Sequence, residues 1–137
     1  MRLELLINVP LTKPLPSANN LREHWVVKAK RVKEQRNGAW FHLLAHGGMR
    51  TVLNMAGVLS RNPQTGITCT LTRISPKRLD DDNLSGAFKA IRDEVAKQVG
   101  LDDGSPRWTW KYAQESGAPG YRIHLEVTAL TQSEVSR

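Results

Sequence analysis

The segment LDDDNLSGAFKAIRDEVAKQVGLDDG, residues 79–104, decides the expected fold of this chain. Its apolar residues recur at three- and four-residue spacing, which predicts one amphipathic helix from Leu84 to Val99. Gly100 is expected to end this helix, and Asp102-Asp103-Gly104 to form the turn that follows. The apolar stripe, through which the helix would pack, consists of Leu84, Ala87, Phe88, Ile91, Val95 and Val99.

Alternating apolar and polar residues predict strands on both sides of this helix. The segments with this alternation are residues 2–9, 67–74, 107–112 and 121–128. A first long helix is expected from residue 21 to about residue 46, ending at Gly47-Gly48, with Gly38 as a point where it could split. The short apolar run 52–58 is interpreted as a weak additional strand. The resulting order, roughly β-α-(β)-β-α-β-β, predicts an α+β (mixed α/β) fold with a mixed sheet covered by two main helices.

Length and composition predict a single small domain. The chain has 137 residues, 39% of them hydrophobic, which is enough for one modest core. We expect this domain at residues 1–130, followed by a loose C-terminal tail at 131–137. The lone Cys69 excludes an intramolecular disulfide and is expected to be a small buried side chain. No apolar run approaches the ~20 residues that span a bilayer, so no membrane-spanning segment and a cytoplasmic location are expected.

The net charge of +7 and a pI near 10.0 favour a polyanionic partner, either nucleic acid or an acidic membrane surface. The charges are segregated along the chain. Residues 1–78 hold 13 Lys and Arg against 3 Asp and Glu, whereas residues 79–137 hold 7 against 10. The acidic residues are therefore concentrated in the second half, around the predicted helix.

Five basic residues occupy nine positions of the first predicted helix, which is more than an ordinary solvated face carries. We interpret them as a surface that follows DNA phosphates, although plain solvation remains the alternative. They are Lys28, Lys30, Arg31, Lys33 and Arg36. Among the aromatic residues, the alternation of Trp108 and Trp110 indicates a strand with one buried or interfacial face. The histidines stand in no acidic motif, so surface or capping roles are expected for His24, His42, His46 and His124.

Three consecutive carboxylates, Asp80-Asp81-Asp82, precede the predicted helix and are followed by Asn83. One Asp there could cap the helix, which is the alternative reading. Three in a row, with a second pair at Asp102-Asp103, favour a site for a hard cation such as Mg²⁺. A helix of about sixteen residues would hold the two groups ~24 Å apart. They can meet only if the chain turns back after Gly100 or if the strand from residue 107 returns alongside the helix.

These motifs resemble the signature of the RusA-like Holliday-junction resolvases. The matching features are Asp80-x-Asp82-Asn83-Leu84, the amphipathic helix, Gly100-Leu101-Asp102-Asp103 and the earlier Pro16-Ser17-Ala18-Asn19-Asn20. They extend over most of the chain, from about residue 3 to residue 128. The resemblance implies a RusA-like fold and a Mg²⁺-dependent endodeoxyribonuclease, with Mn²⁺ able to substitute. It further implies a bacterial or phage-encoded homodimer that resolves four-way DNA junctions in recombination and repair.

Carried over residue by residue, the resemblance assigns Asp80, Asp82 and Asp103 as catalytic carboxylates and metal ligands. Asp102 becomes an auxiliary metal ligand, and Asn19 joins the DNA-binding residues. The family places an essential lysine one helical turn after the second carboxylate, where this chain has Gly86.

On a continuous helix, Lys89 lies seven residues after Asp82, about 20° from its direction and ~10.5 Å along the axis. Helical side chains lean toward the N-terminus, so the Lys89 ammonium could reach back over Gly86 and substitute for the family's lysine. The alternative is that Lys89 pairs with Asp93, and Asp93 with Lys97, on a solvated face.

Two other functions remain open at the level of sequence. The chain could be a non-catalytic DNA-binding module whose acidic groups are caps or a regulatory metal site. It could also be a metal-dependent nuclease that acts on flaps or RNA through the same carboxylates.

Overall fold

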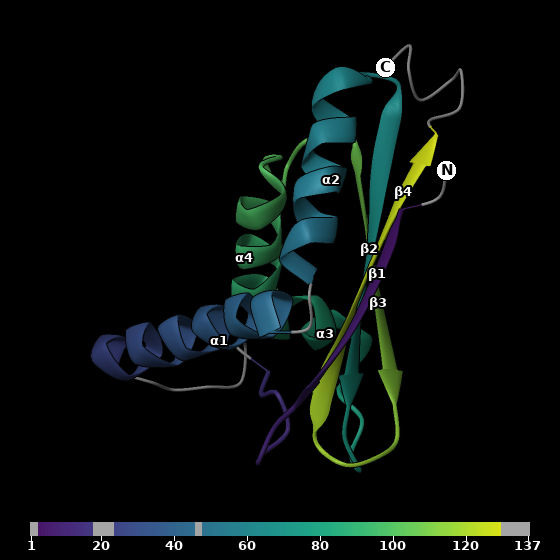
Figure 1. The fold of residues 1–137 in the computed structure, drawn as a ribbon. Coiled ribbons are helices and arrows are strands. Elements are labelled where there is room, and N and C mark those ends of the chain that lie inside the picture. The colour runs from purple at the N-terminus through teal and green to yellow at the C-terminus, as the bar shows by residue number, and fades with distance from the viewer. Residues whose placement is uncertain (1–2, 18–23, 46–47, 130–137) are drawn as a thin grey trace.

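The computed structural model describes residues 3–17, 24–45 and 48–129. Within them, all the helices lie on one face of a single sheet (Figure 1), and no helix combines the length and apolar character needed to cross a bilayer. This two-layer arrangement confirms the predicted α+β class. The strands are β1 (Glu4–Pro10), β2 (Thr65–Ile74), β3 (Trp108–Glu115) and β4 (Gly120–Ala129); the helices are α1 (Trp25–Ala45), α2 (Gly48–Arg61), α3 (Asp81–Ala87) and α4 (Lys89–Val99).

The sheet is mixed, with strand order β1-β4-β2-β3. Strand β4 pairs antiparallel with β1 and β2, whereas β2 and β3 are parallel and are connected through α3 and α4. The four strands predicted from alternation are therefore confirmed, with ends that differ by a few residues. Strands β3 and β4 follow each other in sequence but are not neighbours, because the loop at 116–119 passes the end of β2, which lies between them.

The core lies between the sheet and the helices. Ile67, Cys69 and Leu71 alternate along β2 and are buried on the face that the helices cover. Cys69 is a free, buried thiol, as predicted, and burial raises its pKa strongly because the thiolate would lose its hydration. From the helical side, Phe88 and Ile91 are fully buried. Alternation thus assigns one face of each strand to the core and leaves the other face uncovered.

The first half of the chain departs from the prediction in one place. The long first helix is confirmed as α1, which runs through Gly38 without a break, but the expected strand at 52–58 is wrong, because this segment belongs to α2. The buried residues of α2 include Val52, Met55 and Leu59, which follow helical spacing. At the start of α2, a Cβ on Gly48 would lie 2.5 Å from the carbonyl oxygen of Leu43, so glycine permits the close approach to α1.

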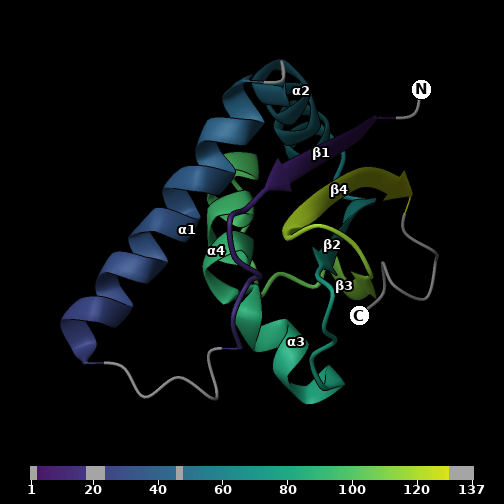
Figure 2. The same ribbon diagram turned by 90° about the horizontal axis from the view of Figure 1, so that it is seen from below.

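The predicted continuous helix from Leu84 to Val99 is also corrected. The chain leaves helical geometry at Phe88 (φ −97°, ψ 2°), which ends α3 and precedes α4. Helix α3 consequently turns away from the axis of α4 (Figure 2). The apolar stripe continues across both helices, because Leu84 and Ala87 of α3 are buried like Phe88 itself. The predicted face therefore packs correctly, but the two helices do not share one axis.

Candidate active site

The chain turns back sharply after α4 and carries the second acidic pair with it. Gly100 adopts the left-handed conformation (φ 80°, ψ 25°) that favours glycine at a helix C-terminus, and its N–H donates to the carbonyl of Ala96 at 2.9 Å. In the following turn, Ser105 N–H donates to Asp102 O at 2.9 Å and Gly104 N–H donates to Asp102 Oδ2 at 3.2 Å. The Asp102 side chain therefore stabilises its own turn.

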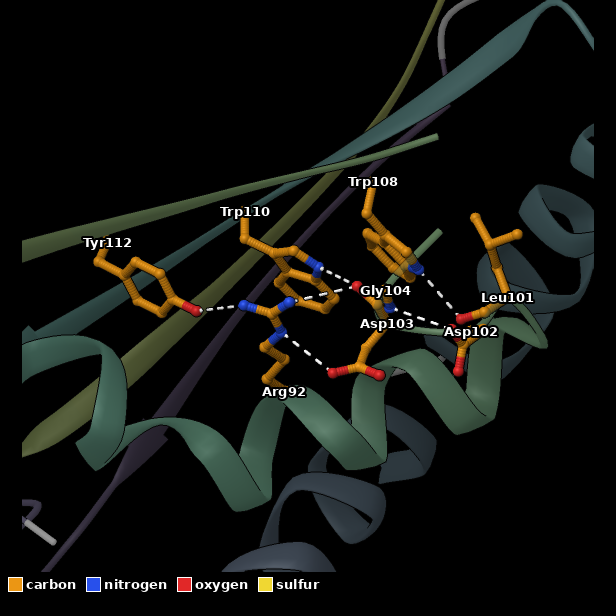
Figure 3. A network of polar contacts seen from close by, with 8 residues as sticks. All are labelled: Arg92, Leu101, Asp102, Asp103, Gly104, Trp108, Trp110 and Tyr112. Atoms are coloured by element: carbon orange, nitrogen blue, oxygen red, sulfur yellow. Dashed lines mark hydrogen bonds and ion pairs between the residues drawn. The ribbon is translucent and has the colours of Figure 1, made fainter. Parts of the chain in front are cut away.

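Two indole groups of β3 hold this turn against the sheet (Figure 3). Trp108 Nε1 donates to the carbonyl of Leu101 at 3.0 Å, and Trp110 Nε1 donates to the carbonyl of Asp103 at 3.0 Å. The two rings stack with centroids 4.3 Å apart and planes inclined by 21°. The alternation of tryptophans thus marks a face of β3 that contacts neighbouring structure, as predicted, and this face positions the acidic turn.

Arg92 of α4 completes the attachment of Asp103. Its guanidinium lies 4.5 Å from the ring centroid of Trp110, donates to Asp103 O at 3.2 Å, and donates to the hydroxyl of Tyr112 at 2.9 Å. Arg92 Nε lies 3.4 Å from Asp103 Oδ2, within ion-pair distance. This nitrogen has no hydrogen bond within the described part of the chain, so the pairing with the carboxylate is electrostatic. Asp103 therefore lies beside α4 and not beyond its end.

The first acidic group is fixed from the same strand, β3. The side-chain amide of Gln114 accepts from Leu79 N–H at 2.9 Å and donates to Leu79 O at 2.8 Å, which holds the residue just before Asp80. Asp80 is the N-cap residue of α3 but its side chain makes no capping hydrogen bond. Among the described residues, the exposed side chains of Asp80 and Asp82 have no hydrogen-bond or ion-pair partner, whereas Asp81 lies 3.8 Å from Arg78. The Asp80 and Asp82 carboxylates are thus available to a ligand.

The predicted metal ligands do not form a compact group. Within the described ranges, Asp80, Asp82 and Asp103 do not belong to any set of three side chains whose ligand atoms lie within 4.8 Å of one another. What they share is an attachment to β3, through Gln114 for the first group and Trp110 for the second. The fold thus anchors both acidic segments on one strand without bringing the three carboxylates into contact.

A pocket of about 340 Å³ brings Lys89 together with Asp103. It is lined by Ser85, Gly86, Lys89, Arg92, Asp93, Asp103 and Tyr112. The break at Phe88 removes the continuous helix on which the predicted reach of Lys89 toward Asp82 depended, but the pocket still places Lys89 beside Gly86. In the described part of the chain, Lys89 forms no ion pair with Asp93. The alternative role of Lys89, a solvated ion pair, is therefore not observed.

The basic side of α1 adjoins this pocket. A second hollow, of about 130 Å³, is lined by Lys28 and Arg31 of α1 and also by Gly86, Lys89 and Asp93, which line the first pocket. Of the predicted DNA-binding residues, Lys28, Lys30 and Lys33 are exposed and Arg31 is half-buried, while Asn19 lies outside the described residues.

Arg36, the last member of the basic set, has a different role. Its Nε donates to Oε1 of the buried Glu94 at 3.2 Å, and the other oxygen of Glu94 accepts from Gln98 at 2.6 Å. Arg36 therefore fastens α1 to α4 and is less available to a phosphate than the exposed lysines.

Sequence reasoning missed the supporting residues of this site. Arg92, Tyr112 and Gln114 act through contacts between α4, β3 and the loops, which no short motif encodes. The one usable signal was the pair of tryptophans on β3, whose indole N–H groups required acceptors once buried.

No protein-family model matches the sequence. An uncharacterized protein of Xylella fastidiosa (strain Temecula1) is 33% identical over 98 residues, which cover 68% of this chain and 59% of the relative. The chain thus spans less than two thirds of the length of that relative.

Proposed function

We propose that this chain is a Mg²⁺-dependent, structure-selective endodeoxyribonuclease of the RusA-like type, which resolves four-way DNA junctions. The observation that supports it best is the continuity of two charged regions. The hollow lined by Lys28 and Arg31 shares Lys89 and Asp93 with the pocket that contains Asp103. A DNA backbone that follows the basic side of α1 is thereby directed toward the acidic turn.

The donor chemistry of the proposed centre suits Mg²⁺. Asp80, Asp82 and Asp103 offer carboxylate oxygens, and Mg²⁺ usually takes one or two carboxylates together with waters and phosphate oxygens. Mg²⁺ held by these carboxylates would supply a coordinated water of lowered pKa and positive charge beside the leaving oxygen. The residues of the chain supply the rest: Arg92 and Trp110 hold Asp103 in place, and Lys89 offsets the negative charge that develops on the phosphate.

The proposal includes a homodimer, because a four-way junction has two-fold symmetry and is nicked on two opposed strands. Exposed aromatic side chains on α1 support an interface there. Trp25 is 74% exposed, Phe41 59% and Trp40 45%, whereas large aromatic side chains are usually mostly buried. Action on recombining DNA also implies the cytoplasm of a bacterium or of a phage-infected cell.

The proposal is tested with synthetic substrates and two adjacent Asp variants. The junction, a matched duplex, a flap and an RNA duplex are incubated with Mg²⁺ or with EDTA. We expect paired nicks in the four-way junction when Mg²⁺ is present and none in EDTA. Asp82→Asn should lower the cleavage rate by about two orders of magnitude, a loss of ~2.7 kcal/mol of transition-state stabilisation. Asp81→Asn removes the same charge from the same helical turn and should cleave at the wild-type rate.

Equal cleavage by the two variants would show that the site assignment is wrong, and preferred cleavage of the flap or the RNA would assign a different substrate. One observation favours a non-catalytic DNA-binding module instead: the three carboxylates do not meet within 4.8 Å. A non-catalytic DNA-binding module would retard the junction in a gel and never nick it.

A further inference from the structure

Three potential metal ligands lie together on the sheet face that the helices leave uncovered. Glu4 of β1 is the direct cross-strand partner of Glu126 of β4, and His124 lies two residues before Glu126 on the same face. The intervening Leu125 is buried on the opposite face, toward the helices. This group is therefore separated by the sheet from Asp103 and its pocket.

The geometry of the group satisfies the requirements for coordination. One ligand atom from each of Glu4, His124 and Glu126 lies within 4.8 Å of the other two, and His124 Nε2 is in direct contact with Glu4 Oε1. Glu4 and Glu126 face each other directly across neighbouring strands, so both carboxylates can reach one ion. The competing explanation of the group is a His124–Glu4 ion pair that involves no metal.

We propose that Glu4, His124 and Glu126 bind a transition-metal dication, with Zn²⁺ as the expected ion. An imidazole with two carboxylates suits Zn²⁺, whereas Mg²⁺ prefers a set composed entirely of oxygen. Three protein ligands leave a fourth tetrahedral position for water, which the exposed face can supply. The ligands stand on paired strands, so their spacing is maintained without the ion. Bound Zn²⁺ would join the edge strand β1 to β4.

The test is a Zn²⁺ titration of untagged, chelator-treated protein by calorimetry. All samples carry Asp80→Asn, Asp82→Asn and Asp103→Asn, which remove the proposed Mg²⁺ ligands on the other face. We expect one Zn²⁺ per chain, with at least tenfold weaker binding in His124→Ala. His24→Ala removes an exposed histidine that directly precedes α1 and should leave the affinity unchanged.

Equal affinity in the parent protein and in His124→Ala would overturn the proposal, as would the absence of a one-to-one Zn²⁺ complex in the parent. Nitrogen-15 NMR of the His124 ring gives a second measurement that requires no variant at the site. On addition of Zn²⁺ we expect the Nε2 resonance to move to the range of a metal-bound nitrogen, and an unmoved resonance contradicts the assignment.

Discussion

Replacing Arg92 with Met tests how the acidic turn is held against the sheet. The substitution removes the hydrogen bonds to Tyr112 and to Asp103 O, the ion pair with the Asp103 carboxylate, and the contact with Trp110, while the unbranched Met retains much of the aliphatic packing. Hydrogen bonds from a charged donor contribute ~1.5–3 kcal/mol each. We use the lower part of this range, because both acceptors are near a pocket that water can enter.

The ion pair adds less than ~1 kcal/mol, because the Asp103 side chain is 40% exposed and solvent screens the interaction. Together these contributions predict a loss of about 3–4 kcal/mol in the free energy of unfolding. Urea denaturation, followed by tryptophan fluorescence, should show a lower midpoint with an unchanged slope. Lys97→Met is the control, since Lys97 is an exposed cation of the same helix without a hydrogen bond or ion pair among the described residues.

The control should change stability by no more than ~0.5 kcal/mol. If Arg92→Met is as stable as Lys97→Met, Arg92 does not anchor the turn and the argument fails. A further arm uses Arg92→Lys, which keeps the positive charge and loses the planar fork. It should recover only part of the lost stability.

Three other perturbations follow from the structure. Phe88→Ala leaves a cavity at a fully buried position between α3 and α4, and it should lower the free energy of unfolding by ~3–5 kcal/mol, as measured by chemical denaturation. A loss under ~1 kcal/mol would contradict the core position of Phe88. Glu115 accepts two hydrogen bonds from Arg122, at 2.8 and 3.1 Å, which lower the pKa of its carboxyl from the ordinary value of 4.5. The stabilisation from this ionised pair is complete above pH 4.5 and is lost as the pH falls through the lowered pKa. Wild type should therefore have a higher Tm than Glu115→Gln at neutral pH, and the two Tm values should converge in acid. A difference in Tm that does not change with pH would refute the linkage. Finally, a triple alanine variant replaces Lys28, Lys30 and Lys33. Its junction affinity should depend less on salt, and the slope of log affinity against log salt concentration should be smaller by up to ~2.7. An unchanged slope would exclude these lysines from phosphate contact.

Local periodicity was sufficient to predict the strands, because each has one covered and one open face and its side chains alternate accordingly. The same signal was present for α2, in the three- and four-residue spacing of Val52, Met55 and Leu59. The apolar run 52–58 concealed it and suggested a strand. The break at Phe88 had no comparable signal, since the apolar stripe continues through both helices while the backbone changes direction.

The candidate site was predictable only in part. Its acidic residues stand in short motifs that the sequence shows directly, and Gly100 marks the reversal that follows α4. The position of Asp103 depends on contacts with Arg92 and Trp110, which belong to different elements. The group of Glu4, His124 and Glu126 was missed because it joins residues about 120 positions apart, and cross-strand register is not encoded in either segment alone.

The central proposal is that the two acidic segments form a shared metal site, and paramagnetic broadening by Mn²⁺ tests it most directly. The measurement uses a His124→Ala protein, so that the uncovered sheet face does not contribute. At a small fraction of one equivalent of Mn²⁺, we predict that the amide signals of residues 80–83 and 102–104 broaden together and recover when excess Mg²⁺ is added. Broadening of only one segment, or of neither, would contradict a shared metal site at Asp80, Asp82 and Asp103.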